Sequence, residues 1–159
     1  MNLFEKYLAS AYYFLNYRPR SEKEVRDKLR DKKATPDIIE KIIAKLKEQR
    51  FLNDETFAQL WIESHMKSKP KSKFVLRMEL KKKGISEEII ESVMQNSESR
   101  IQNDLEVAKD LVERKIKKYK GLERQKIYQK LGGFLVRRGF NWEVSKKAID
   151  DALDKGNDF

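Results

Sequence analysis

The chain has 159 residues, of which 39% are hydrophobic and 39% are charged, and its 36 lysines and arginines exceed its 26 acids to give a formal net charge of +10. It contains no cysteine, which excludes disulfides, thiolate metal sites and thiol catalysis. This strongly positive balance favours polyanionic partners such as nucleic acid, an anionic membrane or an acidic protein.

No stretch of the sequence approaches the roughly 20 apolar residues that a membrane-spanning helix requires. The first apolar segment contains an acid, Glu5, and lacks the small-residue cleavage pattern of a secretory signal. We therefore expect a cytoplasmic protein that does not engage a membrane.

Hydrophobic residues recur at intervals of three and four along the chain, with polar residues between them, and the alternation typical of strands is absent. This pattern predicts an all-α protein. In chain order, the expected helices cover about residues 3–17, 21–33, 36–49, 54–67, 72–83, 87–96, 100–119, 123–138 and 142–154.

Residues suited to helix ends stand at the borders of these segments. Ser21 followed by Glu24 forms a capping-box pattern, and Thr35 precedes a proline that suits a first helical position. Further N-cap candidates are Asn53, Ser86 and Asn141, and helix stops are expected at Gly84 and Gly139.

The sequence also repeats itself. Residues 19–43 align without a gap on residues 70–94, and a weaker third copy follows 55 residues further along the chain. The first alignment pairs Pro19 with Pro70, Ser21 with Ser72, Leu29 with Leu80, Ile38 with Ile89 and Ile39 with Ile90. The first copy differs at Lys33-Ala34, where the other two have glycine, so the end of its second helix is left open.

We therefore predict three tandem three-helix repeats, over residues 1–52, 53–97 and 98–159. A unit of this size buries too little surface to be stable alone, so the repeats are expected to pack on their neighbours in an elongated, curved array. The third helix of each repeat has the clearest core positions: Ile38, Ile39, Ile42, Ile43 and Leu46; Ile89, Ile90, Val93 and Met94; and Val144, Ala148, Ile149 and Leu153.

The sequence offers little for catalysis. His65 is the only histidine, and no second imidazole or thiol can complete a zinc site with it. No nucleotide-binding, serine-hydrolase or zinc-protease motif occurs, and the acids are dispersed as on solvated helix faces. We expect no enzymatic activity, no cofactor and no metal, although a carboxylate metal site assembled by folding is left open.

The basic residues are more informative, because they cluster in equivalent parts of the repeats. In an array, equivalent positions project from one side, so the first two clusters are expected to form one continuous stripe that meets nucleic acid or its complexes. The alternative is a merely solvated charged face. The binding candidates are Arg18, Arg20, Lys23, Arg26, Lys69, Lys71, Lys73, Arg77, Lys81 and Lys82. Basic residues that extend or oppose the stripe are Lys115, Lys117, Lys118, Lys120, Arg124, Lys126, Lys130, Arg137 and Arg138.

Aromatic residues gather on the first helices of the first two repeats and do not interleave with the basic stripe. Most are expected in the core. An alternative is that some of them face a protein partner, for which Phe57 and Trp61 are the candidates. The aromatic set is Tyr7, Tyr12, Tyr13, Phe14, Tyr17, Phe57 and Trp61.

Four blocks of this chain, in their order along it, resemble the recurring blocks of the RecX regulatory proteins of bacteria. They are RPRSEKEVRDKL, FLNDETFAQLWI, KPKSKFVLRMELKKKGI and KLGGFLVRRGF. The resemblance spans roughly residues 7 to 153 and implies three tandem three-helix repeats, in agreement with the internal period.

The resemblance also implies a partner, the recombinase RecA, in homologous recombination, DNA repair and the SOS response. Such a protein is expected to act as a monomer in the groove of the RecA filament on single-stranded DNA, and to hinder filament growth, ATP hydrolysis and strand exchange. Single-stranded DNA, and also double-stranded DNA, are expected partners. The residues that the resemblance places in contact with RecA or filament DNA are Arg18, Arg20, Ser21, Lys23, Arg26, Lys69, Lys71, Lys73 and Arg77.

Asp54, Phe57 and Trp61 belong to the block that begins the second repeat. One alternative function is also open, a sequence-independent DNA-binding repeat protein with no recombinase partner. An enzyme acting on nucleic acid would need a metal or acid–base constellation that these spacings do not provide.

Overall fold

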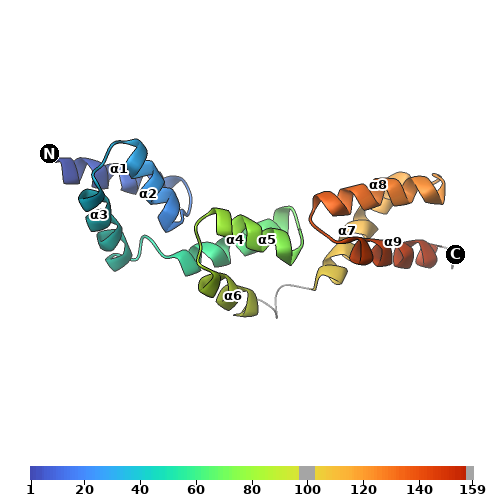
Figure 1. Ribbon diagram of the computed structural model, residues 1–159. Helices are drawn as coiled ribbons and strands as arrows, with labels where there is room; N and C mark the ends of the chain where they lie inside the picture. The colour runs from blue at the N-terminus through green and yellow to red at the C-terminus, as the bar shows by residue number, and fades with distance from the viewer. Residues whose placement is uncertain (97–102, 157–159) are drawn as a thin grey trace. The chain divides into compact units, whose positions relative to one another are not determined.

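The computed structural model describes residues 1–96 and 103–156. In these residues nine α-helices and one short 3₁₀ helix follow one another without a strand (Figure 1), which confirms the all-α prediction. The helices are α1 (Leu3–Tyr17), α2 (Glu22–Asp31), α3 (Pro36–Glu48), α4 (Asp54–Ser68), α5 (Lys73–Lys82), α6 (Glu87–Asn96), α7 (Asp104–Ile116), η1 (Lys117–Tyr119), α8 (Arg124–Arg137) and α9 (Trp142–Gly156). The predicted repeat boundary at 97–98 and the predicted helix start at residue 100 lie outside the described residues.

The chain forms two compact units. The first comprises Met1–Trp61 and Glu79–Met94, and the second comprises Ile62–Met78 and Gln95–Phe159. The division falls inside α4 and α5, so each unit takes a part of the second repeat. The exact repeat boundaries and the elongated, curved array stay predictions.

The helices begin where the sequence places their caps. The Ser21 hydroxyl accepts from the backbone N–H of Glu24 at 3.2 Å, and the Glu24 carboxylate accepts from the backbone N–H of Ser21 at 2.9 Å, so the capping box is complete. Thr35, Asn53, Ser86 and Asn141 each accept from a backbone N–H three residues further on. Asn2 and Asn103, which sequence reasoning did not single out, cap α1 and α7 in the same way.

The second helix of every repeat ends in the same left-handed backbone conformation. Gly84 has φ 81° after α5 and Gly139 has φ 91° after α8, as expected for glycine stops. Lys33, at the equivalent place after α2, has φ 73°. The first repeat therefore ends its second helix like the others and bears the strain of a left-handed residue with a side chain.

Each unit has its own hydrophobic core. The first is built from α1, α2 and α3 around Leu8, Ala11, Val25, Leu29, Ile39, Ile42, Ile43, Leu46 and Leu52. The second is built from α7, α8 and α9 around Val107, Ala108, Leu111, Val112, Ile127, Leu131, Phe134, Leu135, Phe140, Ala148 and Ile149. The predicted core positions of the third helices are buried, except that Ile38, Ile89, Val144 and Leu153 are half-buried.

The first helix of one repeat caps the second helix of the repeat before it. Asp54, at the start of α4, accepts from the backbone N–H of Glu22, the first residue of α2, at 2.8 Å. Asp104, at the start of α7, accepts from the backbone N–H of Lys73, the first residue of α5, at 3.1 Å. This recurring contact satisfies N–H groups that a helix N-terminus leaves without partners.

Two of the seven aromatic residues, most of which are expected in the core, lie at the surface. Tyr13 and Tyr17 are 64% and 70% exposed, and their rings pack edge to face with centroids 5.3 Å apart. They are four residues apart on α1, on the side turned away from Leu8 and Ala11, which are buried.

Candidate nucleic-acid interface

The basic residues that the sequence singles out fall in both compact units. Arg18, Arg20, Lys23, Arg26, Lys81 and Lys82 belong to the first unit, and Lys69, Lys71, Lys73 and Arg77 belong to the second. The first four gather at the N-terminal end of α2, and the second four surround the N-terminal end of α5. A single stripe that runs through both units stays a prediction.

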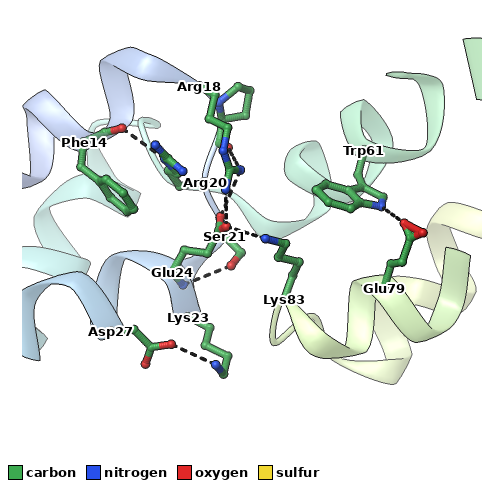
Figure 2. Close-up of polar contacts among 11 residues, drawn as sticks. Phe14, Arg18, Arg20, Ser21, Lys23, Glu24, Asp27, Trp61, Glu79 and Lys83 are labelled. Carbon is green, nitrogen blue, oxygen red and sulfur yellow. Dashed lines mark hydrogen bonds and ion pairs between the residues drawn. The ribbon is translucent and has the colours of Figure 1, made fainter. Parts of the chain in front are cut away.

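At the N-terminal end of α2, cations and carboxylates alternate. Two of the pairs join residues four apart on the helix, and the others bring in partners from outside it. Figure 2 shows the pairs Arg18–Glu24 and Lys23–Asp27. The pairs are Arg18–Glu24 at 2.6 Å, Lys23–Asp27 at 2.9 Å, Arg26–Glu22 at 3.0 Å, and Arg26–Glu40. This surface is therefore much less positive than a count of its lysines and arginines suggests.

Glu24 is the centre of this network. Its carboxylate accepts from Arg18 at 2.6 Å, from Lys83 at 2.9 Å and from the backbone of Ser21 at 2.9 Å (Figure 2). Burial opposes ionisation of Glu24, but the hydrogen bonds from Arg18, Lys83 and Ser21 outweigh it and lower its pKa. The ionised carboxylate thus holds α2 and the end of α5 together.

Glu22 and Arg26 form a second part of the network. Burial raises the pKa of Glu22, but hydrogen bonds from Lys47 and Arg26 more than compensate, so that the net shift is downward. The pKa of Arg26 is raised, first by its hydrogen bond to Glu40 and also by that to Glu22. A partner that removed Lys47 and Arg26 from Glu22 would leave this half-buried carboxylate without compensation, which is costly.

Arg20 packs inside the first unit. Its guanidinium carbon lies 3.9 Å from the centroid of the Phe14 ring, and its Nε donates to the Phe14 carbonyl at 3.3 Å (Figure 2). Burial, followed by the nearby charge of Arg18, lowers the pKa of Arg20. Its position indicates that it anchors the loop between α1 and α2.

In the second unit, the N-terminal end of α5 packs against the end of α8. The Arg138 guanidinium donates to the carbonyl of Pro70 at 3.0 Å, and the backbone N–H of Ser72 donates to the carbonyl of Arg138 at 3.2 Å. Lys69, directly before Pro70, is exposed, whereas Lys71, Lys73 and Arg77 are half-buried. Of the four candidates here, Lys69 offers the most surface.

The last two candidates follow each other at the end of α5. Lys81 pairs with Glu87 at 2.7 Å, and that hydrogen bond lowers the pKa of Glu87. Lys82 is exposed, and no residue in the described part of the chain forms an ion pair with it.

The third repeat brings together a second group of cations, which the sequence analysis names only as residues that extend or oppose the stripe. Lys115 at the end of α7 lies with its ammonium 3.6 Å from the centroid of the Phe134 ring, and the guanidinium carbon of Arg138 lies 4.9 Å from the same centroid. Burial lowers the pKa of Lys115, and so do the charges of Lys118, Arg137 and Arg138. These residues lie up to 23 positions apart in the sequence, from 115 to 138, so only the fold reveals the cluster.

Phe57 and Trp61 occupy different environments. Phe57 is buried, at 3% exposure, whereas Trp61 is half-buried and donates from its indole N–H to Glu79 at 2.9 Å (Figure 2). The ammonium of Lys83 lies 5.2 Å from the Trp61 ring centroid. Contact with a protein partner would thus be made by Trp61, and this interface stays a prediction.

A hollow of about 550 Å³ opens in the first unit where α3 ends and α4 begins. Two of its cations are already engaged, since Arg20 packs on Phe14 and Lys47 lies 2.8 Å from the carboxylate of Glu22. The hollow is lined by Pro19, Arg20, Lys47, Arg50, Phe51, Asn53, Thr56, Phe57 and Leu60.

Among residues 1–96 and 103–156, no group of three or more histidine, cysteine or acidic side chains is arranged to hold a metal ion. Within the same residues, none of the helices combines the length and the apolar character that crossing a bilayer would demand. The lone histidine, His65, lies half-buried near the end of α4.

Three family models match the chain in order. Residues 8–46 match the first three-helix domain of RecX, residues 53–94 match the second, and residues 102–149 match the third. These matches confirm three three-helix domains and together cover most of the chain.

Two curated relatives, both described as "Regulatory protein RecX", match along most of the chain. The protein of Bacillus pumilus is 36% identical over 150 residues, which are 94% of this chain and 56% of that protein. The protein of Bacillus subtilis is 35% identical over 137 residues, which are 86% of this chain and 51% of that protein. This chain thus spans about half the length of the curated relatives it matches.

A solved structure agrees with the sequence matches. The crystal structure of RecX from Lactobacillus salivarius superimposes with a TM-score of 0.75 at 28% sequence identity, covering 93% of this chain and 95% of that one. With the same three domains in the same order, the chain belongs to the RecX family of regulatory proteins.

Proposed function

We propose that this protein regulates RecA by binding the filament that RecA forms on single-stranded DNA, and that it inhibits filament growth, ATP hydrolysis and strand exchange. The observation that carries the proposal is the run of three RecX domains from residue 8 to residue 149. The protein would act as a monomer and by binding alone, without a reaction or a cofactor of its own.

The charges at the N-terminal end of α2 support a protein partner for this part of the molecule. Its cations alternate with carboxylates that are held in place by ion pairs, as with Arg18 and Glu24. Fixed charges of both signs give specificity toward a protein surface of complementary pattern, whereas a uniform phosphate backbone would be repelled by the acids. The exposed cations Lys23 and Lys82 are the best placed to contact RecA.

The runner-up is a sequence-independent DNA-binding repeat protein without a recombinase partner. The net charge of +10 supports it, because unpaired cations bind nucleic acid without regard to base sequence. The two functions differ in what they require of RecA, so they can be separated directly.

The experiment is ATP hydrolysis by RecA of the same bacterium on single-stranded DNA, titrated with this protein. Inhibition at fewer protein molecules than RecA molecules is expected. If a stoichiometric excess leaves hydrolysis unchanged while the protein still binds a single-stranded oligonucleotide, the RecA proposal is wrong and the runner-up stands.

A charge-reversed pair tests the contact residues. The double variant Lys23→Glu with Lys82→Glu should lose inhibition by about tenfold or more, the size typical of truncating two interface charges. The matched control is Lys6→Glu with Lys41→Glu, which changes the net charge equally at exposed positions of α1 and α3. Equal loss in both double variants would show that only the overall charge matters.

A further inference from the structure

Four cations meet at one end of the third repeat. Lys115 lies in the last turn of α7, Lys118 lies in η1, Arg137 ends α8 and Arg138 follows it directly. Lys115 and Arg138 share one aromatic ring, that of Phe134, at 3.6 and 4.9 Å from its centroid. The pKa of Lys115 is lowered, first by burial and then by the charges of Lys118, Arg137 and Arg138. We call these four residues the third-repeat cluster.

The third-repeat cluster lacks carboxylate partners. Among the described residues, no acid forms an ion pair with any of its four members. Lys115 and Arg138 contact the Phe134 ring, and Arg138 also donates to the Pro70 carbonyl. Two acids of the same unit pair with other cations: Asp151 lies 3.0 Å from Lys109, and Asp150 lies 3.9 Å from Arg124. At the N-terminal end of α2, by contrast, Arg18, Lys23 and Arg26 each have a carboxylate.

Holding like charges together without compensation costs free energy, and an anionic ligand removes that cost. Two guanidinium groups and two ammonium groups in one place suit closely spaced phosphates, because guanidinium binds phosphate through paired hydrogen bonds and ammonium binds it as a point charge. The two helix ends strengthen the arrangement, since cations are stabilised at helix C-termini before any ligand arrives.

We infer that the third-repeat cluster binds the phosphodiester backbone of single-stranded DNA, and that it is the principal phosphate-binding site of this protein. A nucleic-acid backbone is favoured over an acidic protein surface because the cluster carries no acid of its own, so nothing in it would repel successive phosphates. The inference deepens the proposed function by stating where a DNA strand meets the protein, and the proposed function is the reason to name a single strand. Lys69 extends the cluster, because it precedes Pro70, whose carbonyl accepts from Arg138.

The test is binding of the full chain to a fluorescent single-stranded oligonucleotide, without RecA, over a series of salt concentrations. The main variant is Lys118→Gln with Arg137→Gln, since both side chains are exposed. Each phosphate contact contributes a slope of about −0.7 to the dependence of log K on log salt for single strands. The variant should therefore bind about tenfold or more weakly at low salt, with a slope shallower by roughly 1.4.

The matched control is Arg30→Gln with Lys155→Gln, two exposed cations that pair with Asp27 and Glu113. It removes the same charge from the chain and should change binding less than twofold. A second variant, Lys115→Gln, is paired with a circular-dichroism melt to separate lost binding from lost packing on Phe134. Equal weakening in the cluster variant and the control would overturn the inference, because only net charge would then matter.

The same variants measured on RecA separate this inference from the proposed function. In one outcome, the unmodified protein leaves RecA activity unchanged while the cluster variant binds the oligonucleotide more weakly than the unmodified protein does. In that case the inference stands and the proposed function fails. If the cluster variant binds the oligonucleotide normally but no longer inhibits RecA, the cluster takes an acidic protein surface and the inference is wrong. A duplex of the same sequence shows whether the site prefers single strands.

Discussion

The ammonium of Lys83 lies 2.9 Å from Oε1 of Glu24, and this ion pair joins the end of α5 to the first turn of α2 (Figure 2). Glu24 also completes the capping box of α2 and pairs with Arg18. Its side chain is only 15% exposed. One carboxylate therefore serves both a helix end and the junction between the first two repeats.

Replacing Glu24 by glutamine should lower the free energy of unfolding at pH 7 by about 2 kcal/mol, the scale of losing charged hydrogen bonds. The pKa of Glu24 is lowered in the folded protein, because its hydrogen bonds outweigh burial. Its stabilisation is thus present above the ordinary carboxyl pKa of about 4.3 and is lost as pH falls through the folded value. Urea unfolding at several pH values should show the wild type and the variant converging in acid.

The control for this prediction is Glu48→Gln, an exposed acid on α3. It should unfold like the wild type at every pH. A Glu24→Gln deficit that persists unchanged at pH 2 would mean that the charge of Glu24 does not contribute.

Gly139→Ala should lower the free energy of unfolding more than Gly121→Ala does. Gly139 has φ 91°, and a β-carbon there would overlap the Val75 side chain and lie 2.6 Å from the Ser72 hydroxyl. Left-handed strain and overlap together should cost about 2–4 kcal/mol. Gly121→Ala is the control, because it has a similar φ of 90° with nothing within 4 Å, and should cost only about 1 kcal/mol. Thermal unfolding measures both losses of stability, and equal losses in the two variants would show that the overlap with Val75 and Ser72 does not contribute.

Lys33→Gly should stabilise the protein. Lys33 is exposed and has φ 73°, so glycine removes a backbone strain of about 1–2 kcal/mol. Glycine also raises the conformational entropy of the unfolded chain, which offsets part of this gain. The net increase in the free energy of unfolding is about 0.5–1 kcal/mol. Lys32→Gly, one residue earlier at φ −83°, should destabilise instead. Chemical denaturation of the two variants gives opposite signs if the backbone conformation is the cause.

Variants at Asp54 distinguish the contribution of its hydrogen bond to stability from the contribution of its charge. Burial raises the pKa of Asp54, although the backbone N–H of Glu22 bonds to it and opposes the shift. Because the folded pKa lies above the unfolded value of about 3.9, ionisation weakens the fold as pH rises through that interval. Asp54→Asn keeps the acceptor without the charge and should match or exceed the wild type at pH 7.

Asp54→Ala should lose about 1 kcal/mol, as for other helix caps, because the N–H of Glu22 is left without its acceptor. Asp104→Ala removes the equivalent bond to Lys73 and should behave alike. The measurement is urea unfolding at pH 7, and an asparagine variant as unstable as the alanine variant would contradict the assignment.

The sequence by itself determined the helices, their caps and the repeat. These features depend on interactions within a few residues: Ser21 and Glu24 are three apart, and the core positions of α3 recur at helical spacing. Even part of the charge pairing was readable in this way, since Glu22 with Arg26 and Lys23 with Asp27 are four apart on one helix.

Only the tertiary structure decided which cations remain without carboxylates. Glu40 reaches Arg26 from α3, and Lys83 reaches Glu24 from 59 positions away in the chain. Lys115, in the last turn of α7, and Arg138, directly after α8, lie over the same Phe134 ring. A sequence gives each lysine and arginine the same formal charge. The electrostatic potential around that charge depends on its burial and on its distance from other charges. Both are set by how the helices pack.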